Sequence, residues 1–113
     1  MAKLGKTPNP TKADFNKVFN ELRKWGYTVI NFSDKRALRK GMKDWVDYTI
    51  FGKRLIIFIE LKIDKDKLSS GQTETALKLT EIAERNSTVI YKQIKTLQEA
   101  TFIVDYLLRA KNG

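Results

Sequence analysis

Apolar residues recur along the chain with two different periods, which together predict three helices and four strands. Between about 12 and 25 they recur every three or four residues, the spacing of one helical face. Thr11 and Asp14 have the pattern of an N-terminal capping box, and Gly26 is a natural C-terminal stop. We therefore expect a first helix over about 12–25. Its apolar face, which we expect to pack into the core, consists of Phe15, Val18, Phe19, Leu22 and Trp25.

Three strand-like segments follow the first helix. β-Branched and aromatic residues dominate 27–32 and 45–51, and an almost continuous apolar run occupies 54–63. Gly52 and Lys53 lie between the last two segments and predict a tight hairpin turn. The third segment is apolar on both faces as far as its charged end, which is typical of a central strand covered on each side.

The second half of the chain predicts a helix, a short strand and a last helix. Ser69 or Ser70 caps the first of these helices, a strand is expected over 88–91, and Thr96 with Glu99 forms a capping box for the last helix. The residues expected to face inward are Ala76, Leu79, Ile82 and Ala83 on one helix, and Leu97, Ala100, Val104, Leu107 and Leu108 on the other.

The resulting order is α-β-β-β-α-β-α, without a repeat or an internal linker. This order predicts a single α/β domain over 11–113, with three layers and a mixed sheet. Residues 1–10 contain both prolines and are expected to form a flexible basic leader.

Composition narrows the chemistry that this domain can perform. The chain of 113 residues has 22 Lys and Arg against 13 Asp and Glu, a formal charge of +9, which favours polyanionic partners. It has no Cys and no His, which excludes disulfides, thiolate nucleophiles and imidazole bases or ligands. Catalysis would then depend on carboxylates, Lys, Tyr or hydroxyl groups, with a metal bound through oxygen. Because no apolar run could span a bilayer and the start has no signal-peptide pattern, we expect a cytoplasmic protein that binds nucleic acid and no membrane.

The end of the third strand contains the most informative residues. Side chains alternate across a strand, so Glu60 and Lys62 share one face at the end of an otherwise apolar run. A strand that simply emerges into water would explain these charges. However, Asp44 begins the hairpin partner and falls near the level of Glu60 when residues are counted back from the turn. Two carboxylates at adjacent strand ends form a minimal oxygen cage for Mg²⁺. Asp47 is the competing acid, and a regular strand would point it to the face opposite Asp44.

Two further features adjoin this segment. Gln72 lies at the first turn of the inward helical face, where it makes either a local helix-start hydrogen bond or a hydrogen bond that supports the site. The basic loop, residues 35–43, contains no acid. It is either a solvated charged face or a phosphate-binding surface that leads into the site. Its candidate DNA contacts are Lys35, Arg36, Arg39, Lys40 and Lys43.

Three short motifs stand at specific places in this order of elements. They are Gly41-x-x-Asp44 at the start of the second strand, Glu60-Leu61-Lys62 at the end of the third, and Gln72 shortly after Leu68-Ser69. Together they resemble the PD-(D/E)xK nuclease superfamily over about 14–108. The likeness is strongest for the VRR-NUC branch of stand-alone phage-type nucleases and more distant for archaeal Holliday-junction resolvases.

The resemblance implies a restriction-endonuclease-like core and a Mg²⁺- or Mn²⁺-dependent DNA endonuclease. The enzyme would hydrolyse phosphodiester bonds with metal-activated water, prefer branched, flapped or junction DNA, and act as a homodimer. If the protein is phage-encoded, it would act in the host cytoplasm. The alternative function is a basic module that binds nucleic acid without cutting it, and a melting shift with Mg²⁺ or Mn²⁺ would distinguish the two.

The resemblance also assigns roles to individual residues. Asp44 and Glu60 would be metal ligands together with the backbone carbonyl of Leu61. Relatives often have a further acid on the first helix, for which Asp14 is the nearest match, although capping explains Asp14 equally well. The sequence departs from the family pattern at Lys43 and Asp47, which leaves the choice between Asp44 and Asp47 open, with Asp44 preferred. Catalysis would involve Asp44, Glu60, Lys62, which would act on the attacking water, and Gln72, which would support the site.

Overall fold

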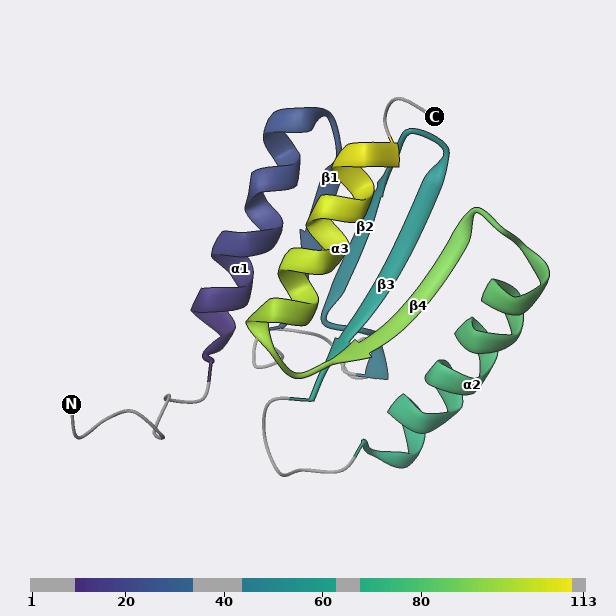
Figure 1. The fold of residues 1–113 in the computed structure, drawn as a ribbon. Coiled ribbons are helices and arrows are strands. Elements are labelled where there is room, and N and C mark those ends of the chain that lie inside the picture. Colours follow the sequence, from purple (N-terminus) through teal and green to yellow (C-terminus); the bar gives the residue numbers. More distant parts are fainter. Residues whose placement is uncertain (1–9, 34–43, 63–67, 111–113) are drawn as a thin grey trace.

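The computed structural model describes residues 10–33, 44–62 and 68–110. The basic loop and residues 1–9 of the expected leader lie outside these ranges. Along the described chain the elements are α1 (Lys12–Asn20), the 3-10 helix η1 (Glu21–Trp25), β1 (Thr28–Asn31), β2 (Tyr48–Gly52), β3 (Leu55–Leu61), α2 (Ser70–Arg85), β4 (Val89–Ile94) and α3 (Leu97–Ala110), as Figure 1 shows.

The first helical segment begins and ends where the sequence predicts. The Asp14 N–H donates to the Thr11 hydroxyl at 3.2 Å, and the Thr11 N–H donates to the Asp14 carboxylate at 2.9 Å. This reciprocal pair satisfies two N–H groups that the first turn would otherwise leave open. At the other end Gly26 has the left-handed backbone (φ 93°) that terminates the segment.

The last turn of this segment differs from the prediction. It is a 3-10 helix, which has three residues per turn and therefore rotates the apolar face relative to α1. Phe15 and Phe19 on α1 are fully buried, as predicted, whereas Trp25 in η1 is 44% exposed. The expectation that Trp25 lies in the core is therefore wrong.

The strands form a mixed sheet in the order β1-β2-β3-β4. β2 is antiparallel to both β1 and β3, and β4 is parallel to β3. The β2–β3 turn consists of Lys53 and Arg54, both with positive φ (53° and 68°), which is the geometry of a type I′ hairpin. The turn thus lies one residue later than the predicted Gly52-Lys53. Gly52 pairs with Leu55 as the last residue of β2.

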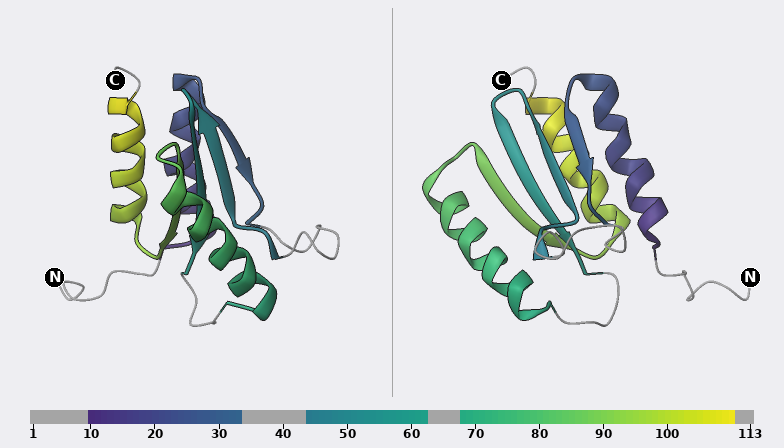
Figure 2. Two further views of the ribbon diagram at one scale, coloured as in Figure 1. Left: turned by 90° about the vertical axis from the view of Figure 1, so that its right-hand side faces the viewer. Right: turned by 180° about the vertical axis from the view of Figure 1, so that it is seen from behind.

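Helices cover both faces of the sheet, as the two views in Figure 2 show. α1 and α3 pack together on one face, here called the α1/α3 face, and α2 packs on the other, the α2 face, mainly against β4. These observations confirm the predicted α/β class, the three layers and the mixed sheet. Among the described helices, none is long and apolar enough to cross a bilayer.

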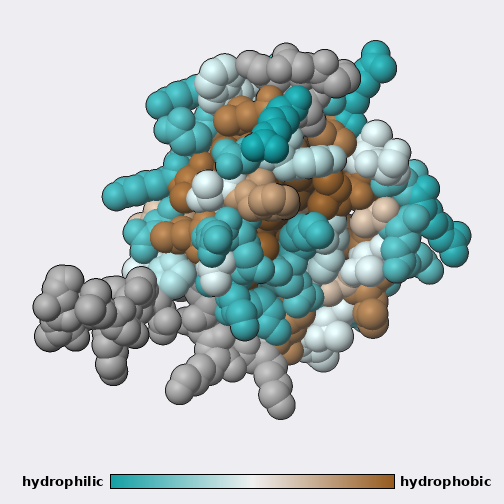
Figure 3. All heavy atoms as spheres, viewed as in Figure 1, coloured by the Kyte–Doolittle hydropathy of each residue, from teal (hydrophilic) through white to brown (hydrophobic). Residues whose placement is uncertain are grey.

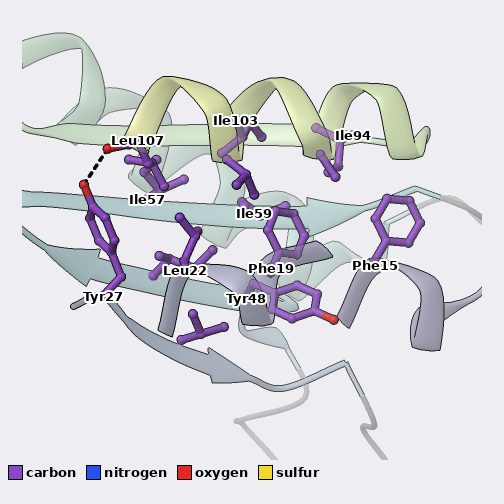
Figure 4. Packing of buried hydrophobic residues seen from close by; sticks show 14 of the residues in the cluster. Phe15, Phe19, Leu22, Tyr27, Tyr48, Ile57, Ile59, Ile94, Ile103 and Leu107 are labelled. Atoms are coloured by element: carbon purple, nitrogen blue, oxygen red, sulfur yellow. Dashed lines mark hydrogen bonds between the residues drawn. The ribbon is translucent and has the colours of Figure 1, made fainter. Parts of the chain in front are cut away.

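The large core lies on the α1/α3 face. Figure 4 shows Phe19 of α1 beside Ile59 of β3 and Phe15 near Ile94 of β4, with the side chains of α3 above them. The Phe19 and Tyr48 rings are 4.8 Å apart between centroids. At one end of the core the Tyr27 hydroxyl donates to the Leu107 carbonyl at 2.8 Å, as Figure 4 also shows. The predicted inward residues of α3 belong to this cluster or pack against it.

Three details of the second half refine the prediction. β4 extends to Ile94, three residues beyond the predicted end at 91. Ala76 and Leu79 of α2 are buried as predicted, but Ile82 is 44% exposed, so the expectation that it faces inward is wrong. α3 begins with the predicted capping box, in which the Glu99 N–H donates to the hydroxyl of Thr96 at 3.0 Å.

Candidate acidic site at the ends of β2 and β3

Two buried acidic residues lie at opposite positions in the strand register where β2 begins and β3 ends. The last pair of the antiparallel ladder is Tyr48 with Ile59, and continuing the ladder by one position places Asp47 opposite Glu60. The Leu61 N–H donates to Asp47 Oδ2 at 2.8 Å, which fixes the Asp47 side chain against the end of β3. Asp47 is 5% exposed and Glu60 is 4% exposed, so both acids are withdrawn from water.

Asp44 lies elsewhere. Its carboxylate is packed directly against Gly71 at the start of α2, and the Ser69 hydroxyl donates to its Oδ1 at 3.4 Å. The chain from Asp44 to Asp47 is not a regular strand, and the hairpin turn is displaced by one residue. The expectation that Asp44 stands level with Glu60 is therefore wrong, and Asp47, the competing acid, occupies that position.

Asp44 instead complements the N-terminal end of α2. The first backbone N–H groups of a helix carry partial positive charge, so a carboxylate there is stabilising. This contact ties the segment before β2 to the helix that covers the α2 face.

Lys62 follows directly after β3. Its backbone N–H donates to the Ile94 carbonyl at 2.7 Å, so the chain remains paired with β4 for one residue beyond β3. Alternation along this extended chain places Lys62 on the same side as Glu60. Its side chain is half-buried. The backbone thus places Lys62 on the side of the chain that Glu60 occupies, and its role at the carboxylate pair stays a prediction.

The sequence analysis missed two polar residues of β4. The parallel register pairs Glu60 with Gln93 and Phe58 with Tyr91, so Asp47, Glu60 and Gln93 form one row across three strands. The Gln93 side-chain amide donates to the Tyr91 hydroxyl at 2.9 Å. The alternation Tyr91-x-Gln93 was the available signal, but the predicted strand ended at 91.

The negative charges of Asp47 and Glu60 affect the ionisation of the Tyr91 phenol. Burial raises the pKa of Tyr91 above its ordinary value, and the negative charges of Glu60 and Asp47 raise it further, while the hydrogen bond from Gln93 acts in the opposite direction. A phenol that is harder to ionise remains a hydrogen-bond donor over the physiological range. The acid pair therefore has a neutral donor group close by, on the neighbouring strand.

Gln72 and Asp14 both act as helix caps. The Gln72 amide oxygen accepts from the Ser69 N–H at 3.0 Å, and the Gln72 N–H donates to the Ser69 hydroxyl at 3.1 Å, so the local helix-start hydrogen bond is the one observed. Support of the site by Gln72 stays a prediction. Asp14 belongs to α1, on the α1/α3 face, and its capping hydrogen bonds with Thr11 lower its pKa. An accessory role for Asp14 likewise stays a prediction.

The donor set at the strand ends suits a hard divalent cation. Over the ranges that the structure describes, no three acidic side chains form a metal-binding group, so any ion held by Asp47 and Glu60 would need further oxygen ligands. Mg²⁺ is bound in proteins by one or two carboxylates and retains several waters. The residues present therefore fit such an ion.

The predicted DNA contacts Lys35, Arg36, Arg39, Lys40 and Lys43 fall in the basic loop and lie outside the described residues. They precede the acid pair by only a few positions in the sequence. Comparison of the chain with models of known protein families, with curated proteins and with solved structures finds no match.

Proposed function

We propose that this protein is a metal-dependent DNA endonuclease with a restriction-endonuclease-like core. The observation that carries the proposal is the burial of Asp47 and Glu60 at opposite positions in the strand register, with Lys62 following two residues after Glu60. Two carboxylates at the ends of adjacent strands supply the oxygen ligands through which proteins bind Mg²⁺, and this donor set supports the proposal. The element order and the parallel pairing of β3 with β4 support the same fold.

Asp47 and Glu60 would hold Mg²⁺ or Mn²⁺ together with the backbone carbonyl of Leu61. When bound, the ion would polarise the scissile phosphate and lower the pKa of a water molecule. Asp47 takes the ligand role in preference to Asp44, whose carboxylate is used at the start of α2.

Lys62 would act on the attacking water and on the scissile phosphate. Water attacks phosphorus as the bond from phosphorus to the leaving sugar oxygen breaks, and negative charge grows on the phosphate oxygens. The Lys62 ammonium would orient the water and offset that charge, which is the kind of electrostatic stabilisation that accelerates such reactions most. The low exposure of the two acids keeps water screening of these interactions small.

The formal charge of +9 suits a phosphodiester polymer. The basic loop leads directly toward Asp47 in sequence, and we propose that its cations bind phosphates on either side of the scissile bond. Phosphate contacts position a nucleic acid without reading its sequence. Recognition of branched, flapped or junction DNA, action as a homodimer and a cytoplasmic location are expectations from the resemblance.

A nicking assay on branched and linear DNA in Mg²⁺ or Mn²⁺ tests the proposal. We expect Asp47→Asn, Glu60→Gln and Lys62→Ala each to lower cleavage by about 100-fold or more, because each removes a group that acts on the transition state. Asp44→Asn is the matched control, an acid at the neighbouring position that should retain most of the activity.

Metal binding is measured separately by thermal unfolding. A metal concentration one hundred times the dissociation constant should stabilise the wild type by about 2.7 kcal/mol. Asp47→Asn and Glu60→Gln should abolish this shift, and Asp44→Asn should keep it. Equal cleavage by wild type and all variants would reject the enzyme assignment. DNA binding with neither cleavage nor a metal shift would identify the non-catalytic binding module instead.

A further inference from the structure

The outer edge of β4 is an open side of the sheet. β4 stands last in the strand order, and among the described strands only β3 pairs with it. The Lys62 N–H donates to the Ile94 carbonyl, so the main-chain groups of Ile94 and of every second residue before it point toward β3. The N–H and C=O groups of Tyr91 and Gln93 therefore point away from β3, where no described strand meets them.

Two hollows follow this edge. The first, of about 290 Å³, is bounded on one side by Thr80, Ala83 and Glu84 of α2. The second, of about 490 Å³, is bounded on one side by Gln98, Glu99 and Phe102 of α3. Figure 3 shows the face on which α3 lies, where apolar side chains reach the surface among hydrophilic ones. The hollows leave the edge of β4 open between the two helices.

The opposite edge of the sheet, at β1, is protected by cations. The Phe32 N–H pairs with β2, so the alternate carbonyls of Val29 and Ser33 face outward. The Arg23 guanidinium donates to the Val29 carbonyl at 2.6 Å, and the Lys12 ammonium donates to the Ser33 carbonyl at 2.7 Å. Charged side chains commonly protect edge strands in this way, because unpaired main-chain groups attract other strands. Strand addition is thus favoured at β4 and opposed at β1.

A second copy of β4 fits the open edge in an antiparallel orientation. A two-fold axis at Tyr91 places the outward groups of Tyr91 opposite those of Tyr91 of the partner subunit, and Val89 opposite Gln93 of the partner subunit. An axis at Gln93 would extend the pairing to Lys95, whose N–H already donates to Glu99 at 2.9 Å. The axis at Tyr91 keeps the pairing within β4.

The side chains of β4 also complement the two hollows. In this register Ile90 of the partner subunit faces the hollow at Phe102, which is 73% exposed and would gain an apolar neighbour. On the other face of the sheet, Gln93 of the partner subunit faces the hollow at Thr80 and Glu84, whose oxygens can accept from its amide. Apolar groups therefore meet on one face and polar groups on the other.

We propose that β4 is the edge through which two copies of this chain pair, forming an eight-stranded sheet with a two-fold axis at Tyr91. Such a contact uses the same surface of both subunits, so it consumes both open edges. The edges that remain are the two protected β1 strands, which stops growth at two subunits. The strand pairing does not depend on the proposed chemistry.

Pairing through β4 would place both acid pairs on the same face of one sheet. Because Gln93 is the β4 partner of Glu60, the Glu60 residues of the two subunits would lie three strand spacings apart and four residues apart along the strands, a separation of about 20 Å. Two such sites could cut two strands of one branched DNA. This consequence alone rests on the proposed nuclease function.

Sedimentation equilibrium in EDTA, without DNA, measures pairing apart from cleavage. We expect the wild type to be a dimer at micromolar concentration. Gln93→Pro should weaken the dimer by about 10-fold or more, because it removes an outward N–H and no hydrogen bond to β3. Gln93→Ala is the matched control, which keeps this N–H and should weaken the dimer by less than about threefold. Circular dichroism checks that both variants are folded.

Cysteine cross-linking tests the position of the axis without a proline. The chain contains no Cys, so Tyr91→Cys introduces a single thiol. Directly opposite residues at hydrogen-bonded positions have Cα atoms about 5.5 Å apart, which suits a disulfide. Oxidised Tyr91→Cys should therefore run as a covalent dimer on a non-reducing gel. Gln93→Cys is the control, because its two copies would lie about 13 Å apart and should not cross-link.

Several outcomes would overturn the inference. A monomeric wild type, a dimer unaffected by a folded Gln93→Pro variant, or cross-linking through Gln93→Cys in place of Tyr91→Cys would each do so. Assemblies larger than two subunits would show that β1 also pairs, which contradicts its protection. DNA cleavage in Mn²⁺ is measured separately. A monomer that cleaves DNA would defeat the strand pairing alone, and a dimer that does not cleave would defeat the nuclease proposal alone.

Discussion

The two faces of the sheet are built differently. On the α1/α3 face, side chains from α1, α3 and all four strands form one continuous apolar core. Phe19, Ile59 and Leu107 in this core are almost completely buried. Among the described residues, the buried apolar cluster on the α2 face is small and consists of Val46, Phe58 and Leu79, and the buried acids lie beyond it. One face therefore supplies the stability of the domain, and the other accommodates charged groups that packing alone would not favour.

The same contrast appears along a single strand. In β3, Ile57, Ile59 and Leu61 point to the α1/α3 core, while Ile56, Phe58 and Glu60 point to the α2 face. The alternation lets one rigid element hold a carboxylate in a fixed position while its opposite side remains in the core. A site on a central strand is thereby positioned more rigidly than a site on a loop.

The largest expected effect is the loss of a phenylalanine ring from the large core, compared with the same loss from the small cluster. Phe19→Ala should destabilise the protein by about 3–5 kcal/mol, because it opens a cavity in the large core and removes the ring packed on Tyr48. Phe58→Ala should cost about 1–2 kcal/mol less, because its cluster is smaller and lies nearer to solvent. Phe58, like Phe19, contacts one other aromatic ring: the centroids of Phe58 and Trp45 are 5.5 Å apart. The two substitutions therefore remove similar aromatic contacts.

Urea unfolding monitored by circular dichroism measures both free energies. Leu77→Ala, on the exposed side of α2, should change the free energy of unfolding by less than about 0.5 kcal/mol. A Phe58→Ala cost equal to or above that of Phe19→Ala would show that the two faces contribute equally to stability.

Tyr48 is a polar group in the otherwise apolar α1/α3 core. Its side chain is fully buried, and its hydroxyl has no hydrogen-bond partner of good geometry among the described residues. Burial raises the pKa of Tyr48 to about 12, with the charge of Asp47 adding to the effect and Ser33 opposing it. An unfolded tyrosine ionises near pH 10, so the folded state should lose about 2 kcal/mol of stability as pH rises from 10 to 12.

Tyr48→Phe tests whether the Tyr48 hydroxyl causes this pH dependence. The variant should be as stable as the wild type at pH 7 or more stable by about 1 kcal/mol, because it removes a buried hydroxyl without a partner. Its unfolding free energy should then fall less steeply than that of the wild type between pH 10 and 12. Parallel pH profiles for the two proteins would show that Tyr48 ionises as readily when folded as when unfolded.

The sequence predicts the α1/α3 face well and the α2 face less well. Helical periodicity identified Phe15, Phe19 and the inward residues of α3, because the spacing of apolar residues is enough to show which face of a helix packs into a large core. The Trp25 error arose from a change of helix type within one segment, which periodicity over so few residues does not reveal.

The site depended on register, which is harder to predict. Moving a two-residue turn by one position shifts every cross-strand partner by two residues, so the residue opposite Glu60 changes from Trp45 to Asp47. Lys53 and Arg54 adopt a turn that usually contains Asn or Gly, so the sequence pointed to Gly52-Lys53, and counting back from there favoured Asp44 over Asp47. The residue types of the acid pair were thus predictable, and the partner of Glu60 was not.

The smallest expected effect concerns how α2 is attached. A side chain at Gly71 would occupy the space of the Asp44 carboxylate, so Gly71→Ala must displace that acid from the helix start. We expect a loss of about 1 kcal/mol, in spite of the better helix propensity of alanine, because a carboxylate at a helix N-terminus stabilises it by a similar amount. In an Asp44→Ala background the same substitution should be neutral or stabilising, which gives a coupling energy of about 1 kcal/mol in a double-mutant cycle. If Gly71→Ala cost the same in both backgrounds, Asp44 would not stabilise α2. Because neither residue belongs to the Asp47–Glu60 pair, both variants should still show the metal-dependent melting shift, which distinguishes the attachment of this face from its chemistry.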